Sequence, residues 1–186
     1  ALLLGYPLPL AAVQILWINI VTEGTVTVNL IMEPPEGDEM RRRPVSPDEA
    51  LLSRPLLGRV ALMTPAMALS TLGFFAWRLS SGVPFELVQT ETFTVLAACQ
   101  WFNVLNCESA TRSALRFGLA RNKWLLGGLG LSILLQLAVI YAEPLNKLFH
   151  TVPIPPTDLL LIVGVASLVL WLEEIRKLIA RRQGRT

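Results

Sequence analysis

Five apolar stretches, each about as long as a lipid bilayer is thick, constrain the fold of this chain more than any other feature. A helix of about 20 apolar residues crosses the hydrocarbon layer of a membrane. Only 16% of the 186 residues are charged and the mean hydropathy is +0.53, whereas about 25% of the residues of a soluble domain are charged. We therefore predict an all-α fold, a polytopic transmembrane helical bundle that forms a single membrane domain over residues 1–186. Its membrane-spanning helices, about five in number, cover about 9–32, 56–79, 91–115, 123–142 and 157–179.

The basic residues predict which side of the membrane each connection occupies. Fourteen of the 16 lie within 41–59, 112–123 and 176–185, and only Arg78 and Lys147 lie on the other side. Connections rich in Lys and Arg stay in the cytoplasm, so we predict an integral, multi-pass membrane protein with an exoplasmic chain start and a cytoplasmic C-terminus. Anionic lipid headgroups account for the basic connections, and we predict the lipid bilayer as a partner and no nucleic acid.

Three polar residues, Asn19, Thr22 and Glu23, interrupt the first apolar stretch. Their spacing of i, i+3 and i+4 places them on one face of a helix. A carboxylate at mid-membrane costs roughly 2.5–3.5 kcal/mol on insertion scales, and such residues usually mark an ion or proton path. Amide, hydroxyl and carboxylate oxygens together suit hard cations such as Ca2+, Na+ or Mn2+. The alternative is a polar face that hydrogen-bonds other helices, but Glu23 favours ion binding.

Gly24 follows these residues directly. A glycine beside ligands lets a helix loosen and expose carbonyl oxygens, and such backbone is tolerated within a membrane where it lines a polar cavity. Thr25, Thr27 and Asn29 continue the polarity along the same stretch. We expect these three side chains to pack or to line the path rather than to bind the ion.

The third stretch carries a second group of polar side chains, Gln100, Asn103, Asn106 and Cys107. At 100° per residue they fall within about 120° of helix surface and form a stripe. The stripe either completes an ion site or bonds to neighbouring helices, and the residues alone do not decide between the two.

Further residues have simpler interpretations. Gln136, within the fourth stretch, is expected to hydrogen-bond another helix. Glu173 and Lys177 have the spacing of an ordinary i, i+4 ion pair on a surface turn. The prolines of 142–158 are expected to keep that connection irregular. Close packing between helices is expected at three glycines of the fourth stretch, Gly127, Gly128 and Gly130.

Four segments resemble the membrane region of type II P-type cation ATPases, the calcium-pump branch especially. PLAAVQILWINIVTEG at 9–24 is similar to the sixth transmembrane segment of that family, which typically reads P-x-x-x-x-Q-x-L-W-x-N-L-x-T-D-G. EPPEGDEMRRRP at 33–44 resembles the loop that follows, P-P-x-x-x-x-M-x-R-x-P. The runs at 122–149 and 170–182 look like the ninth and tenth segments. The five stretches would then be segments six to ten, and ALLL at the chain start the end of segment five.

The resemblance implies ATP-driven cation transport through a phospho-aspartate intermediate. It implies that Asn19 and Thr22 supply oxygen ligands and that Glu23 stands where the family has a bridging aspartate. Gln100 and Asn103 occupy positions where sodium-pump-like relatives carry Gln and Asp. The transported cation is expected to be Ca2+, with Mn2+ or Na+ as alternatives.

The chain itself is expected to contain no catalytic and no cofactor-binding residue. It lacks the D-K-T-G phosphorylation motif, so we expect the cytoplasmic ATPase domains, which bind ATP and Mg2+, and the upstream transmembrane helices to belong to a full-length chain of which this is a fragment. Such a translocase would depend on those parts as partners.

Two departures from the family pattern bear on the ion. Glu23 is one methylene longer than the family aspartate, which alters the geometry of the site. Ala110 stands about where calcium pumps with two sites place an acid. The alternative function is a free-standing, non-enzymatic membrane module that binds or regulates other membrane proteins. A secondary transporter would show inverted repeats, and the sequence shows none.

Overall fold

A computed structural model describes residues 1–2, 5–29, 54–107 and 122–182 of the chain. All regular structure within these ranges is helical, which confirms the predicted all-α fold. The elements are α1 (Ala12–Trp17), which continues directly into the π-helix η2 (Ile18–Thr27), then α2 (Arg54–Ser80), α3 (Phe85–Cys107), α4 (Lys123–Tyr141), α5 (Glu143–Phe149) and α6 (Pro156–Arg182).

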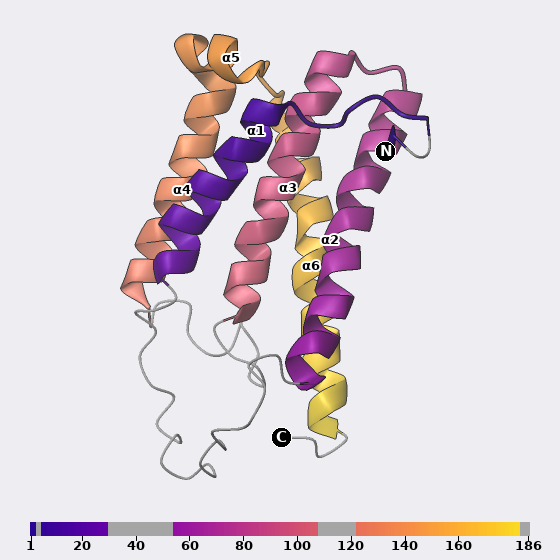
Figure 1. The fold of residues 1–186 in the computed structure, drawn as a ribbon, viewed down its shortest axis with the longest axis vertical. Coiled ribbons are helices and arrows are strands. Elements are labelled where there is room, and N and C mark those ends of the chain that lie inside the picture. Colours follow the sequence, from indigo (N-terminus) through magenta and orange to yellow (C-terminus); the bar gives the residue numbers. More distant parts are fainter. Residues whose placement is uncertain (3–4, 30–53, 108–121, 183–186) are drawn as a thin grey trace.

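The long helices run side by side, and α3 lies at the centre of the bundle (Figure 1). It packs against α6, α2, η2 and α4. The α1–η2 segment packs on α4, and α2 packs on α6. The short helix α5 lies across the end of α4, at the same end of the bundle as the turn from α2 to α3 (Figure 1). This arrangement places η2 and the second half of α3 next to each other, which is the relationship that the candidate site requires.

Each predicted stretch contains a helix, although the boundaries differ. The third helix begins at Phe85 rather than near 91, and its predicted end at 115 lies outside the described residues. In the part of the chain that the structure describes, two helices are long and apolar enough to cross a membrane by length and composition, Leu56–Ser80 within α2 and Lys123–Tyr141. The α3 and α6 helices have 23 and 27 residues and are long enough at 1.5 Å per residue, but buried polar side chains interrupt them. The count of five spans stays a prediction.

The prolines of residues 142–158 predict an irregular connection after α4, but part of it is helical. Its first part forms α5, with Pro144 in the first turn. Proline is well suited to that position because the first N–H groups of a helix have no acceptor within the helix. The helix ends at His150, which adopts a left-handed conformation with φ 53°. Pro144 therefore favours helix α5, in a connection where the sequence analysis expects irregular backbone.

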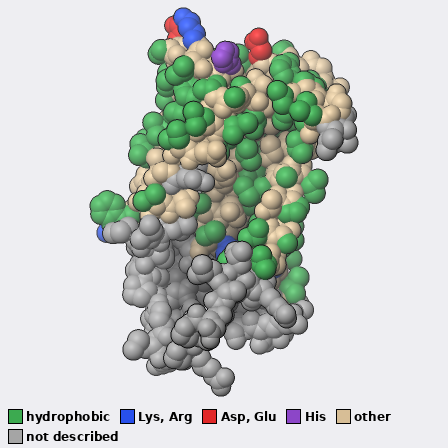
Figure 2. Space-filling view, viewed as in Figure 1, with side chains coloured by type: hydrophobic (Ala, Val, Ile, Leu, Met, Phe, Trp, Pro, Cys, Tyr) green, Lys and Arg blue, Asp and Glu red, His purple; other side chains and the backbone are tan. Residues whose placement is uncertain are grey.

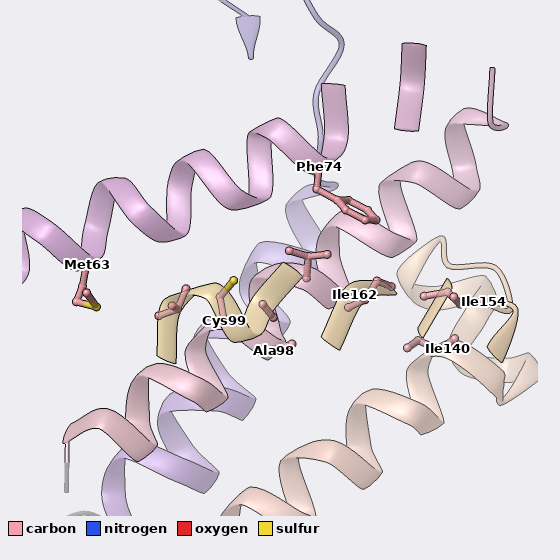
Figure 3. Close-up of a cluster of buried hydrophobic side chains, with 10 residues drawn as sticks. Met63, Phe74, Ala98, Cys99, Ile140, Ile154 and Ile162 are labelled. Atoms are coloured by element: carbon pink, nitrogen blue, oxygen red, sulfur yellow. The ribbon is translucent and has the colours of Figure 1, made fainter. Parts of the chain in front are cut away.

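The main hydrophobic core joins α2, α3, α4 and α6 (Figure 3). Phe74 of α2, Ala98 and Cys99 of α3, and Ile162 of α6 are almost entirely buried in it. Ile154, from the connection before α6, closes one end of this core. Burial of such side chains contributes about 1.5–3 kcal/mol each in water; within a lipid layer, close packing takes over this role.

The exterior of the bundle is also apolar. Leu69 of α2, Leu134 of α4 and Leu160 of α6 are 70%, 66% and 76% exposed. Figure 2 shows hydrophobic side chains spread over one face of the bundle, with charged side chains at its upper end and near the grey residues and few between them. Soluble monomers rarely expose apolar surface over several helices, so this exterior is typical of a bundle that lies in lipid.

Candidate functional site

A cavity of about 250 Å³ lies between η2, α2 and α3, and it holds three of the five predicted ligand residues. Asn19 reaches it from η2, and Gln100 and Asn103 reach it from α3. All three bear a side-chain amide, whose oxygen is a ligand for hard cations. The complete lining is Ile18, Asn19, Thr27, Met67, Gln100, Asn103 and Val104.

The backbone that carries Asn19 is not α-helical. From Ile18 to Thr27 it forms a π-helix of ten residues, in which each N–H bonds the carbonyl five residues back. The predicted loosening beside Gly24 therefore takes the form of a widened helix. A Cβ at Gly24 would meet no atom within 4 Å, so packing does not require glycine there. Departures of this kind are frequent at functional sites.

Thr22 and Glu23 lie in the middle of η2. Their side chains are not among those described, and their role as ligands stays a prediction. Within the described ranges, no three His, Cys, Asp or Glu side chains gather as a metal cluster would. The oxygens that the structure brings together are thus amide and hydroxyl oxygens, which leaves Glu23 as the predicted source of negative charge.

The polar stripe of α3 divides between two surroundings. Gln100 and Asn103 line the cavity, whereas Asn106 is fully buried and donates its side-chain N–H to the carbonyl of Val169 in α6 at 3.3 Å. Cys107 is exposed, and its Sγ lies 3.5 Å from Nη2 of Arg59 in α2. Asn106 thus bonds to a neighbouring helix, whereas a role of Gln100 and Asn103 in an ion site stays a prediction. Ala110 lies outside the described residues.

The three polar residues at the end of the first stretch also separate. Thr27 lines the cavity. Thr25 donates its hydroxyl to the carbonyl of Val21 at 2.6 Å, and the Asn29 side chain donates to the carbonyl of Thr25 at 2.6 Å. Thr25 and Asn29 thus satisfy the backbone of their own helix, as expected of packing residues.

Among the three glycines of α4, only Gly128 has the predicted role in close packing. A Cβ at Gly128 would collide with the carbonyl of Thr25 and the side chain of Asn29, whereas one at Gly127 or Gly130 would meet nothing. Gln136 makes the predicted interhelical contacts: it accepts from the indole of Trp17 at 3.3 Å and donates to the hydroxyl of Thr94 at 3.4 Å.

The prediction of a surface pair at Glu173 and Lys177 is wrong. Both side chains are fully buried. Glu173 pairs with Arg59 of α2 at 3.0 Å and with Arg176 at 2.7 Å, and Lys177 donates to the carbonyl of Asn106 at 3.1 Å. Spacing within one helix predicted a local pair, but the side chains face α2 and α3 instead.

A second ionic cluster, at the opposite end of the same helices, was not anticipated. Arg78 of α2 donates from Nε and Nη2 to the two carboxylate oxygens of Glu91 in α3 at 2.8 and 2.5 Å. The same Nη2 lies 2.6 Å from Asp158 of α6. The sequence does carry a signal for this pair: Arg78 lies at the end of one apolar stretch and Glu91 at the start of the next. A carboxylate buried there requires a partner.

Comparison with known proteins covers nearly the whole chain. The family described as "Cation transporting ATPase, C-terminus" matches residues 7–179. The chain is 40% identical over 174 residues to mouse (Mus musculus) calcium-transporting ATPase type 2C member 2, which covers 92% of this chain and 18% of the mouse protein. It is 38% identical over 169 residues to a calcium-transporting ATPase of Bacillus subtilis (strain 168), which covers 90% of this chain and 19% of that protein. For calcium-transporting ATPase 1 of Schizosaccharomyces pombe, identity is 34% over 180 residues, 97% of this chain and 20% of that protein.

The chain thus spans about a fifth of the length of these relatives. The matched residues include every described helix up to Ile179 in α6, and with them both walls of the cavity that holds Asn19, Gln100 and Asn103. This chain belongs to the cation-transporting ATPase family, as a C-terminal region of such a protein.

Proposed function

We propose that this chain is the C-terminal membrane region of an ATP-driven cation pump and that it binds the transported cation between η2 and α3. The observation that carries the proposal is the shared cavity, into which two helices far apart in sequence bring Asn19, Gln100 and Asn103. Asn19 is exposed and Gln100 and Asn103 are half-buried, and polar side chains at membrane depth are costly unless they hydrogen-bond or bind a ligand. Their convergence on one cavity supports a binding role.

The proposed ligands are Asn19, Thr22 and Glu23 from η2, and Gln100 and Asn103 from α3. Ca2+ is the favoured cation, because relatives 38–40% identical to this chain bear the name calcium-transporting ATPase and hard oxygen ligands suit it. Mn2+ and Na+ are the alternatives. Ca2+ takes about 6–8 oxygen ligands, so we infer that water or upstream helices of a longer chain supply the remainder.

The energy source lies outside these residues in this proposal. ATP and Mg2+ bind to cytoplasmic domains of the full-length protein, and no residue of this chain takes part in the phosphoryl transfer. The relatives are about five times longer than the matched region, which leaves room for such domains. The contribution of this chain is to bind the cation and to release it as the bundle changes conformation.

We infer that five spans place the chain start on the exoplasmic side and its end in the cytoplasm. The helix directions support this, since the ends of α2, α3, α4 and α6 that adjoin the basic connections lie at one end of the bundle (Figure 1). Arg78 and Lys147 belong to the opposite end, near the α2–α3 turn and in α5. Charge asymmetry of this kind sets membrane orientation.

The test is the ATPase activity of the full-length protein against Ca2+, Mn2+, Mg2+, Na+ and K+, with a Glu23→Gln variant. We expect micromolar Ca2+ to activate the unmodified protein and Glu23→Gln to abolish the activation, because the amide removes the negative charge. Glu143→Gln is the matched control, since Glu143 is 84% exposed in α5 and far from the cavity. Cation-dependent turnover that survives in Glu23→Gln would refute the assignment. Activation by Na+ or K+ alone would exclude calcium.

A further inference from the structure

Helix α4 presents three small or polar residues to the two helices that carry the proposed ligands. Gly128, Ser132 and Gln136 are buried, and their spacing of four residues places them on one stripe of the helix. None of the three lines the cavity. Each nevertheless contacts a residue close in sequence to one that does.

Gln136 bridges the two ligand-bearing helices. Its Oε1 accepts from the indole N–H of Trp17, two residues before Asn19, at 3.3 Å. Its Nε2 donates to the hydroxyl of Thr94, in the turns of α3 that precede Gln100, at 3.4 Å. One side chain of a third helix therefore fixes both elements, and it is 3% exposed.

Ser132 holds the second indole. Its hydroxyl accepts from the N–H of Trp101 at 2.9 Å, and Trp101 lies between Gln100 and Asn103 in the sequence. The ring also packs against a cluster of Val26 from η2, Val104 from α3 and Leu125 from α4.

Farther along the stripe, α4 touches η2 itself. The Thr25 carbonyl and the Asn29 side chain lie so close to Gly128 that a Cβ on this residue would collide with both. Asn122, which caps α4 by accepting from the N–H of Leu125 at 2.9 Å, also donates to the carbonyl of Asn29 at 3.2 Å. The far end of η2 is thereby joined to the start of α4.

We propose that Gln136 and Ser132 are positioning residues: through the Trp17 and Trp101 indoles they set the rotation of η2 and α3 that brings Asn19 and Asn103 to the same cavity. The expected effect on the affinity for the cation rests on the proposed function. The expected effect on the relative rotation of η2 and α3 does not depend on it. A role confined to stability would leave the relative rotation of the two helices unchanged, so the two are separable by measurement.

The first test measures the geometry directly. In the full-length protein, with Cys99 and Cys107 replaced by alanine, Asn19→Cys and Asn103→Cys are linked by a short bifunctional thiol reagent. We expect Trp17→Phe to slow the cross-linking about fivefold, the effect of losing one ordinary hydrogen bond. Gln136→Met also loses the bond to Thr94 and should slow it at least as much. The double variant should be no slower than Gln136→Met alone, because both substitutions remove the same Trp17–Gln136 bond. Trp124→Phe is the matched control, since Trp124 is the 65% exposed tryptophan of the same helix.

Ser132→Ala with Trp101→Phe forms an independent second pair, which tests the inference even if a Gln136 variant fails to fold. The inference is overturned if these variants lower the melting temperature and leave the cross-linking rate unchanged. The second readout is the cation concentration for half-maximal ATPase activity, which we expect to rise severalfold while the maximal rate is retained. Absence of cation activation in the unmodified protein would refute the proposed function and leave the cross-linking result standing.

Discussion

Arg59 of α2 forms an ion pair with Glu173 of α6, with a distance of 3.0 Å between Nε and Oε1, and the Glu173 side chain is fully buried. Arg176, on the next turn of α6, binds the same carboxylate at 2.7 Å. A buried carboxylate without a partner is strongly destabilising. The guanidinium groups of Arg59 and Arg176 therefore both neutralise the Glu173 carboxylate, and Arg59 comes from another helix.

Replacing Arg59 by leucine should lower the stability of the bundle. Complete loss of the partner of a buried charge costs about 3–5 kcal/mol, and because Arg176 remains we expect about 2 kcal/mol. Thermal unfolding in detergent measures the change. Lys147→Leu is the control, because its pair with Glu143 is exposed on both sides and such pairs contribute little. Equal melting temperatures for Arg59→Leu and the unmodified protein would contradict this account.

Arg78→Lys should destabilise the protein more than Asp158→Asn. The guanidinium of Arg78 binds both oxygens of Glu91 and also Asp158, and an ammonium group cannot reproduce this planar fork. Asp158→Asn removes only the outer contact, from a side chain that is 20% exposed. Resistance to a protease in detergent gives the order of the two variants. Greater sensitivity of Asp158→Asn would show that the Glu91 contact is not the dominant one.

Gly128→Val should separate η2 from α4. The added side chain would meet the Thr25 carbonyl, and overpacking of a close contact costs about 1–3 kcal/mol. Gly127→Ala, one residue earlier and open on the same helix, should be neutral or stabilising by up to about 1 kcal/mol, since alanine favours helix. Unfolding midpoints of the two variants check the prediction, and a similar loss in both would argue against a specific contact at Gly128.

Asn103→Leu should weaken cation binding without loss of the fold. The substitution removes one amide oxygen from the cavity, and we expect the half-saturating cation concentration to rise about tenfold, or ~1.4 kcal/mol. Met67→Leu is the control, because it changes the shape of the same cavity and removes no oxygen. The measurement is cation-activated ATPase activity of the full-length protein. An unchanged half-saturating concentration in Asn103→Leu would remove this residue from the ligand set.

Much of the fold was predictable because it depends on local patterns. The length of the apolar stretches predicted the helices. Polar residues inside those stretches marked Asn19, Gln100 and Asn103 as candidate ion-site residues. Their shared cavity followed from no local pattern, since it depends on how η2 and α3 pack. The polar stripe of the third stretch left a shared ion site open as one of two alternatives, and the resemblance to a known family favoured it.

The failures have the opposite cause. Glu173 and Lys177 fit the spacing of a surface pair, but both are buried, and each binds a group on another helix, Arg59 and the carbonyl of Asn106 respectively. Helix α5 was missed because its proline was taken as a breaker, although it lies in the first turn. The π-helical form of η2 was anticipated only as loosening beside Gly24. Spacing along one helix cannot report which face the rest of the bundle covers.

The two ionic clusters have a mechanical consequence. Arg78 joins α2, α3 and α6 at one end, and the contacts of Arg59 and Lys177 join the same three helices at the other. Three helices joined at both ends are expected to resist shear relative to one another. Among the described residues, the α1–η2 segment takes part in neither cluster; it packs on α4 and α3, and Gln14 of α1 donates to the carbonyl of Phe149 in α5. If the chain binds a cation as proposed, we expect relative motion between this triplet and the α1–η2 segment to be limited by the Gln136 contacts that join them, and the cation would lie at the boundary between η2 and α3.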